Sequence, residues 1–416
     1  MTSVPTKTAF LFRAFRYPNY RLFFGGQIVS LIGSWIGSTA TSWLVYRLTG
    51  SALLLGLVGF MNQFPAFFVT PFGGLIVDRW DRRRLLVATQ TLSMLQSLAL
   101  AFLALTQQAT VPALLFLSAV QGLVNAFDMP GRQAFVVDLI ENKDDLGNAI
   151  ALNSSMFNLA RLVGPTIGGL LIAAVGEGWC FFIDGLSYLA VICALLIMRT
   201  RPPAPSKPHP RGVLHSLWEG WRYAYRSRPI RSILALLALA SMLGAPYMTI
   251  VPIFAGKVLK GGPHTMGFLM TAGGCGALLG ALTLAVRPSS TGVARWIPRG
   301  AVIFGLGLIA FSFSRVLWVS MLLLVVAGFG FMIQMGASNT HIQTIVDDDK
   351  RGRVMSLFVM SWLGAAPIGS VVAGSLTETI GAPNTLMLGG LCCLAGGIWF
   401  YKKNREPFLG PEKLIG

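Results

Sequence analysis

The sequence has little charge. Only 12% of its 416 residues are Asp, Glu, Lys or Arg, whereas an ordinary soluble domain has about 25%. Hydrophobic residues make up 54% of the chain, and the mean hydropathy is +0.65. A chain of this length lacks the polar surface to cover soluble cores. The composition therefore excludes an ordinary soluble protein and indicates a protein whose solvent is largely lipid.

The sequence also lacks the motifs of metal, redox and nucleotide chemistry. It has no CxxC pair, no HExxH segment and no GxxxxGK[ST] phosphate-binding loop, and its four histidines are scattered. Its five cysteines all fall in apolar runs, at Cys180, Cys193, Cys275, Cys392 and Cys393. An odd number of cysteines in such runs argues against a disulfide framework. We therefore expect no metal site and no cofactor, and we expect neither enzymatic activity nor direct use of ATP.

Twelve apolar runs are long enough to cross a bilayer, which takes about 20 residues in a helix. They lie at 22–46, 53–77, 85–106, 111–127, 149–174, 179–198, 232–255, 265–286, 297–314, 317–340, 354–377 and 384–401. The runs do not alternate polar with apolar residues, as membrane strands do, so we expect helices. The first run has no cleavage site of small residues and is expected to be a retained helix. The sequence predicts an all-α membrane protein.

Basic residues fall on one side of this predicted topology. Of the 33 Lys and Arg residues, 28 lie in the termini and in the loops that share their side, and 4 lie on the other side. This bias indicates that both termini are cytoplasmic. The net charge of +17 then faces anionic lipid, and it does not indicate nucleic-acid binding. We expect a multi-pass protein of a bacterial inner membrane that acts as a monomer.

The chain reads as two related halves. The predicted domains are a six-helix bundle over 1–198, a cytoplasmic linker over 199–231 and a second six-helix bundle over 232–416. The linker places apolar residues at helical spacing, which predicts an amphipathic helix in the membrane interface, at Leu214, Leu217, Trp218, Trp221 and Tyr225. At an offset of 205, Gly147, Leu152, Gly164, Gly169, Leu171 and Gly176 match Gly352, Leu357, Gly369, Gly374, Leu376 and Gly381. Two parallel six-helix repeats suit an alternating-access transporter.

Two motifs resemble those of a known family. GGLIVDRWDRR, between the second and third apolar runs, resembles the loop signature of the major facilitator superfamily at Gly74, Asp78, Arg79, Arg82 and Arg83. In the fifth run, GPTIGG resembles the core of the superfamily's antiporter signature, at Gly164, Pro165, Gly168 and Gly169. FRYPNYRLFFGGQIVSLIGSW and NAFDMPGRQAFVVDL are similar to the exporter branch that contains the enterobactin exporter and macrolide efflux proteins. The resemblance covers residues 13–403 and implies the major facilitator fold.

The resemblance implies a conformational latch at the cytoplasmic side. Asp78 would meet the start of the eleventh helix near Val354, where a helix N-terminus attracts a carboxylate. Gly74, one turn earlier, would let that helix approach closely, and Arg132 is a candidate partner of Asp78. The alternative is a solvated turn whose arginines only anchor it in the cytosol. In the fifth run, the glycines of GPTIGG predict close packing, and Pro165 predicts a kink that serves as a gate.

Polar residues inside the predicted helices are candidates for the substrate cavity. Arg161 is the one basic residue deep within a run, and it reads either as a cavity charge or as a structural arginine bonded to carbonyls. The other candidates are Gln27, Asn62, Gln121, Asn125, Asn158, Gln334 and Asn339. Many proton-coupled members of the superfamily have Arg-x-x-Gln-Gly in the fourth helix, and here Ser118 replaces that arginine.

The sequence thus predicts a secondary transporter that exports small amphipathic molecules of the drug, macrolide or siderophore kind. Alternating access coupled to proton antiport is the expected mechanism. An importer or a lysophospholipid flippase on the same fold is the alternative. A membrane-embedded enzyme is disfavoured, because no catalytic constellation is present in the predicted helices.

Overall fold

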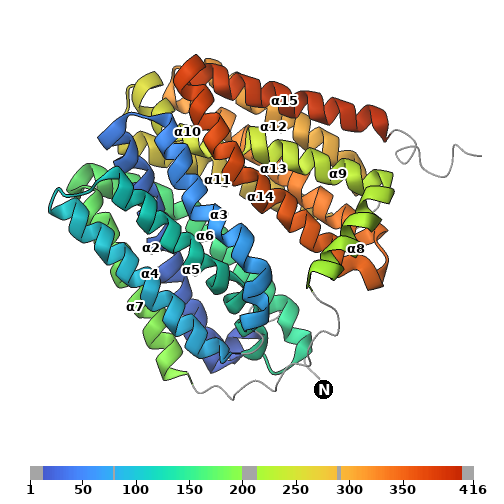
Figure 1. Ribbon diagram of the computed structural model, residues 1–416, viewed down its shortest axis with the longest axis horizontal. Coiled ribbons are helices and arrows are strands. Elements are labelled where there is room, and N and C mark those ends of the chain that lie inside the picture. The colour runs from blue at the N-terminus through green and yellow to red at the C-terminus, as the bar shows by residue number, and fades with distance from the viewer. Residues whose placement is uncertain (1–12, 78–79, 199–212, 288–291, 405–416) are drawn as a thin grey trace, which may run out of the picture. The chain divides into compact units, whose positions relative to one another are not determined.

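The computed structural model describes residues 13–77, 80–198, 213–287 and 292–404. In these ranges the regular elements are all helical (Figure 1). The first repeat contains η1 (Arg13–Arg16), α2 (Pro18–Thr49), α3 (Ala52–Val77), α4 (Arg82–Leu105), α5 (Val111–Asp138), α6 (Lys143–Val175) and α7 (Glu177–Ile197). The linker helix and the second repeat contain α8 (Val213–Arg226), α9 (Arg228–Leu239), η2 (Ala240–Gly244), α10 (Tyr247–Ile253), η3 (Phe254–Val258), α11 (Pro263–Ala285), η4 (Val293–Arg295), α12 (Trp296–Phe313), α13 (Leu317–Ile345), α14 (Asp348–Ile380) and α15 (Ala382–Lys403).

Twelve helical segments of the described chain are long and apolar enough to cross a membrane, which confirms the predicted number. The seventh of them, Arg228–Val258, contains two π-turns, η2 and η3, on either side of α10. Their five-residue bonds run from Ala245 N to Ala240 O at 2.8 Å and from Leu259 N to Phe254 O at 3.0 Å. Pro246 and Pro252 lie in this stretch. Because proline has no N–H to donate to the preceding turn, the backbone widens locally and the helix continues.

Several helices extend beyond the apolar runs that predicted them. The run over 111–127 proves too short, because α5 continues through Pro130 to Asp138. The run over 149–174 begins late, because α6 starts at Lys143, where Asn142 caps it by accepting a hydrogen bond from Asp144 N at 3.0 Å. An apolar run ends at the first polar residues. A helix continues wherever those residues find partners or a cap.

The internal duplication is confirmed by two matching helices. Helices α6 and α14 each span 33 residues, and their first residues, Lys143 and Asp348, are separated by the offset of 205 at which the sequence repeats. Each helix ends at a glycine with positive φ, +87° at Gly176 and +83° at Gly381, and the next helix begins directly afterwards. Only glycine adopts this conformation without strain, so both turns depend on it.

The chain divides into two compact units that do not follow the repeats throughout. The first unit comprises residues Met1–Leu44 and Met61–Pro208, and the second comprises Val45–Phe60 and His209–Gly416. The end of α2 and the start of α3 therefore belong with the helices of the second repeat. The predicted domain boundaries follow the duplication of the sequence, and they stay a prediction.

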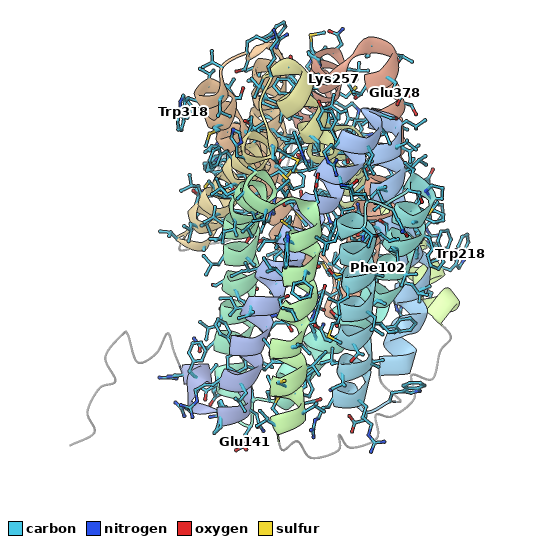
Figure 2. All side chains as sticks on the ribbon, turned by 90° about the vertical axis from the view of Figure 1, so that its left-hand side faces the viewer. Phe102, Glu141, Trp218, Lys257, Trp318 and Glu378 are labelled. Atoms are coloured by element: carbon cyan, nitrogen blue, oxygen red, sulfur yellow. The ribbon has the colours of Figure 1, made fainter. Side chains whose placement is uncertain are left out.

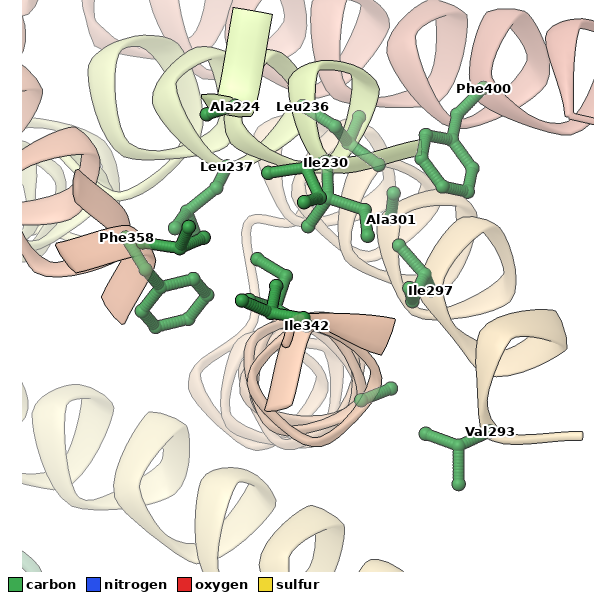
Figure 3. Close-up of a cluster of buried hydrophobic side chains, with 14 residues drawn as sticks. Ala224, Ile230, Leu236, Leu237, Val293, Ile297, Ala301, Ile342, Phe358 and Phe400 are labelled. Atoms are coloured by element: carbon green, nitrogen blue, oxygen red, sulfur yellow. The ribbon is translucent and has the colours of Figure 1, made fainter. Parts of the chain in front are cut away.

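In the second unit a buried apolar cluster joins the linker helix to the membrane helices. Ile230 and Leu237 of α9 meet Ile342 of α13 and Phe358 of α14 (Figure 3). An ion pair of 2.5 Å between Arg353 of α14 and Glu219 of α8 adds a polar contact. Helix α8 confirms the helix predicted in the linker. Its Trp218, Trp221 and Tyr225 are exposed and stack on one another, which leaves an aromatic stripe uncovered within the unit.

Candidate functional site

The arginine-rich turn is anchored to the first unit. Asp81 caps α4 by accepting a hydrogen bond from Arg84 N at 2.9 Å. Arg82 forms an ion pair of 2.7 Å with Asp138 at the end of α5. Arg83 donates to Leu196 O near the end of α7, at 2.7 Å. The turn is therefore tied to two neighbouring helices through its side chains.

The structure describes the remaining latch residues only in part. Asp78 and Arg79 lie outside the described residues, and only the helical backbone of α3 is described at Gly74. Arg132 lies inside α5, where its Nε is 2.7 Å from Asp128 Oδ2, one turn earlier. Its described partner is thus Asp128. The contact of Asp78 with Arg132 and with the start of α14 stays a prediction.

Asp128 is the centre of a buried polar cluster that the sequence analysis missed. Its side chain is 4% exposed. Its Oδ1 accepts hydrogen bonds from Thr89 Oγ1 at 2.9 Å and Gln90 Nε2 at 2.7 Å, both on α4. With Arg132 on its other oxygen, both oxygens of the buried carboxylate have partners. The four-residue spacing of Asp128 and Arg132 could have predicted their ion pair, since residues at this spacing are neighbours on a helix.

The glycines of the GPTIGG segment form a packing face. A Cβ on Gly164 would lie 2.3 Å from Trp35 Cβ, and a Cβ on Gly168 would lie 3.1 Å from Thr39 Cβ. At Gly164 helix α6 therefore contacts α2 too closely for a side chain to fit without a shift, and at Gly168 a side chain would be tight. Pro165 lies inside α6, which runs on as one α-helix, and Gly169 is buried in it. The gating role of this segment stays a prediction.

Arg161 lies near the middle of α6 and is partly buried. Within the described chain it has no hydrogen bond or ion pair. Two of the other cavity candidates, Asn158 and Asn125, have hydrogen bonds to other groups. Asn158 donates to Ser154 O of its own helix at 2.9 Å, and Asn125 accepts from Gln121 at 3.2 Å. Both interpretations of Arg161, the cavity charge and the structural arginine, stay predictions.

The other cavity candidates are divided between the two units. In the first unit Gln121 also donates to Ser93 Oγ at 3.2 Å, and the backbone of Asn62 closely faces Gly122 of α5. Gln27 is buried, and its Oε1 has no hydrogen-bond partner. In the second unit the buried Gln334 donates to Leu236 O at 3.4 Å, while Asn339 accepts from Gln343. Each unit thus contributes separate polar groups.

A second buried carboxyl lies in α7. Asp184 is 6% exposed, and its Oδ2 is 2.8 Å from Ser97 Oγ of α4, while its Oδ1 has no hydrogen-bond partner among the residues that the structure describes. Two glycines of α2 face it: a Cβ on Gly37 would lie 2.5 Å from Oδ2, and a Cβ on Gly33 would lie 3.3 Å from Oδ1. The carboxyl therefore lies where α2, α4 and α7 meet.

A third acid joins α14 to the start of α3, inside the second unit. Glu378 Oε1 accepts hydrogen bonds from Ser51 Oγ and from Leu53 N, the latter at 3.2 Å. Lys257 Nζ donates to Gly50 O at 3.0 Å. Figure 2 shows Lys257 and Glu378 at the same end of the helices. An open hollow of about 550 Å³ is lined by Gly50, Ser51, Lys257 and Glu378, among others.

The described residues contain no group of three or more His, Cys, Asp or Glu side chains placed to hold a metal ion. They do contain a set of buried polar groups between packed helices. The sequence profile of the transmembrane secretion effector family matches residues 10–408. The chain belongs to this family of the major facilitator superfamily.

Curated relatives resemble this major facilitator protein over nearly their whole length. The Staphyloferrin A transporter of Staphylococcus aureus is 25% identical over 388 residues, which cover 93% of this chain and 96% of the relative. The multidrug efflux pump Tap of Mycolicibacterium fortuitum is 27% identical, covering 88% and 91%. Macrolide efflux protein A of Streptococcus pyogenes is 22% identical, covering 91% and 96%.

Solved structures show the same fold. The nucleoside transporter NupG superposes with a TM-score of 0.77 at 14% identity, covering 93% of this chain and 99% of its own. A bacterial homologue of the lysosomal transporter Spinster gives 0.70 at 17% identity, covering 94% and 96%. The expected twelve-helix major facilitator fold is confirmed, and the protein is a multi-pass secondary transporter of small molecules.

Proposed function

We propose that this transporter exports small amphipathic molecules of the siderophore, macrolide or drug kind from the bacterial cytoplasm in exchange for protons. The duplication supports alternating access, since α6 and α14 are equivalent helices in two six-helix repeats. The full-length relatives that move such molecules support the substrate class. Because the sequence has no ATP-binding loop, the proton gradient is the energy source that we propose.

The orientation and setting belong to the same proposal. The 28-to-4 distribution of basic residues supports cytoplasmic termini and an inner-membrane location. The exposed aromatic stripe of α8, with Trp218 62% exposed, supports contact of this helix with the lipid interface. We propose that the protein acts as a monomer, because each six-helix repeat would supply one half of a single transport path.

Transport into inverted membrane vesicles tests this proposal. Labelled erythromycin and a catecholate siderophore serve as probes, with and without a protonophore. Accumulation in inverted vesicles that the protonophore abolishes supports proton-driven export. Accumulation only in right-side-out vesicles would mean import, and movement of a labelled lysophospholipid alone would mean a flippase. Accumulation that survives the protonophore would overturn the coupling to protons.

A further inference from the structure

We propose that Asp184 is the proton-binding site of this transporter. The proposal rests on the proposed exchange of substrate for protons and names the group that takes up the proton. The site consists of the Asp184 carboxyl and the Ser97 hydroxyl, enclosed by α2, α4 and α7. Its ligand is a single proton, taken up by the carboxylate and released again in each transport cycle.

The hydrogen-bond geometry accommodates a protonated carboxyl. Ser97 Oγ is 2.9 Å from Phe181 O and 2.8 Å from Asp184 Oδ2. A serine hydroxyl has one proton, which it can donate to only one of these two oxygens. If Ser97 donates to the carbonyl of Phe181, the second short contact needs a proton on Asp184. A protonated Asp184 that donates to Ser97 satisfies both contacts.

No cation balances the charged form of Asp184 among the described residues. The groups that face it from α2 are Gly33 and Gly37, and the group from α4 is Ser97. The nearby titratable group on α7 is Tyr188, whose hydroxyl lies 3.1 Å from Ser34 Oγ on α2. An ionised carboxylate here would be buried and unpaired, which is costly in a membrane segment. The site therefore takes up a proton readily and changes its contact with α2 when the proton leaves.

Few acids compete for this role. The sequence has 16 Asp and Glu residues, and most lie at the ends of the helices or outside them. Asp128 lies within a membrane helix, but it is paired with Arg132 at 2.7 Å. Asp184 lies seven residues after the start of α7, about 10 Å along the helix. Of these two acids, it is the one with no described cation partner.

Infrared difference spectroscopy of the purified protein tests the site without any substrate. The wild type should show the carbonyl stretch of a protonated carboxylic acid that appears and disappears with pH, and Asp184→Asn should lack this band. Ser97→Ala should keep the band and shift its titration midpoint. Asp144→Asn, which removes an exposed acid at the start of α6, is the control and should leave the band unchanged. A titrating band that persists in Asp184→Asn would overturn the proposal.

Transport measurements separate this inference from the proposed function. In vesicles, Asp184→Asn should lose erythromycin accumulation driven by the proton gradient and keep exchange of labelled for unlabelled erythromycin. Full gradient-driven accumulation in Asp184→Asn would overturn the assignment. If the wild type transports neither probe and still shows the titrating band, the proton site stands and the proposed substrate class falls.

A separate observation carries a second inference. We infer that Gly374 and Glu378 of α14 form an extracytoplasmic latch on the start of α3. Glu378 accepts from Ser51 and from Leu53 N, and a Cβ on Gly374 would lie 2.5 Å from Ala52 O. The glycine provides the close approach, and the carboxylate meets the exposed N–H groups of a helix start.

The spacing of this pair repeats that of the predicted cytoplasmic latch. Gly374 and Glu378 are four residues apart near the end of α14, and Gly74 and Asp78 are four residues apart around the end of α3. The latch of α14 holds the start of α3, and the predicted latch of α3 would hold the start of α14. In an alternating-access cycle the two latches would close in turn, so each would favour the opposite conformation.

Cysteine labelling tests the extracytoplasmic latch. A single cysteine at Ala382, a buried residue that lines the hollow beside Glu378, is labelled with a membrane-impermeant maleimide in a background without the native cysteines. Because Glu378→Gln weakens a charge-assisted hydrogen bond, it should raise the labelling rate about tenfold. Ser375→Ala, which alters only an exposed bond within α14, is the control.

The two latches are expected to change the labelling rate in opposite directions, and this difference is the most direct test. Asp78→Asn should lower the labelling rate, and the double variant with Glu378→Gln should return it toward the wild-type rate. Gly374→Leu should act like Glu378→Gln, because the leucine blocks the approach to Ala52. An unchanged rate in both Glu378→Gln and Gly374→Leu would show that this contact does not control opening. If Asp78→Asn and Glu378→Gln changed the labelling rate in the same direction, the proposal that the two latches favour opposite conformations would be overturned.

Discussion

Replacing Arg132 with methionine should destabilise the first unit by about 3 kcal/mol. The substitution leaves Asp128, 4% exposed, without the guanidinium that lies 2.7 Å from its Oδ2. Breaking a buried ion pair in this way typically costs about 3–5 kcal/mol. We take the lower end because the Arg132 side chain is itself 21% exposed and because Thr89 and Gln90 still donate to the other oxygen.

The measurement is reversible unfolding of the purified protein in mixed micelles, followed by tryptophan fluorescence. Arg84→Met, which replaces an exposed arginine at the start of α4, is the control and should change the stability by less than about 0.5 kcal/mol. Combining Arg132→Met with Asp128→Asn should recover most of the loss, because the amide carries no charge that needs a partner. A double variant as unstable as Arg132→Met alone would refute the reasoning.

Three further predictions concern packing, topology and Arg161. Gly164→Ala should cost about 1–3 kcal/mol, because its Cβ would lie 2.3 Å from a Cβ of α2, whereas Gly147→Ala, with nothing within 4 Å, should be tolerated; the unfolding assay measures both. Single cysteines placed at Lys207 and Thr110 should be labelled from opposite sides of the membrane, and labelling of both from outside would contradict the twelve-helix topology. Arg161→Lys should keep the fold and lose most erythromycin transport per folded protein, because lysine keeps the charge and loses the planar set of donors; normal transport would remove Arg161 from the site.

The apolar runs predicted the number of membrane helices correctly, but they did not predict the residues at which the helices begin and end. The backbone must satisfy its own hydrogen bonds in lipid, so a long apolar run has little choice of structure. The ends depend on side-chain partners instead. The run over 111–127 stopped at Asp128, yet α5 continues because Arg132 and residues of α4 satisfy that carboxylate.

Single residues of the candidate site were harder to place, because their partners are distant in the sequence. Ser97 and Asp184 are 87 residues apart, and Ser51 and Glu378 are 327 residues apart. No local pattern predicts such a pair without the fold. The cap at Asp81 is different. It joins two residues that are three positions apart, and aspartate is a preferred cap, so the sequence could have predicted it.

The contacts of α2 connect the proposed proton site to the proposed latch. Gly33 and Gly37 of α2 face the Asp184 carboxyl, and its C-terminal end leads into Gly50, whose carbonyl accepts from Lys257 in the second unit. Because α2 is one continuous helix from Pro18 to Thr49, a shift forced at Gly37 would reach Gly50 through rigid backbone. Loss of a proton from Asp184 adds a charge against α2 with no described cation nearby. Such a change would favour a conformation in which α2 has moved away from the carboxylate at Gly33 and Gly37.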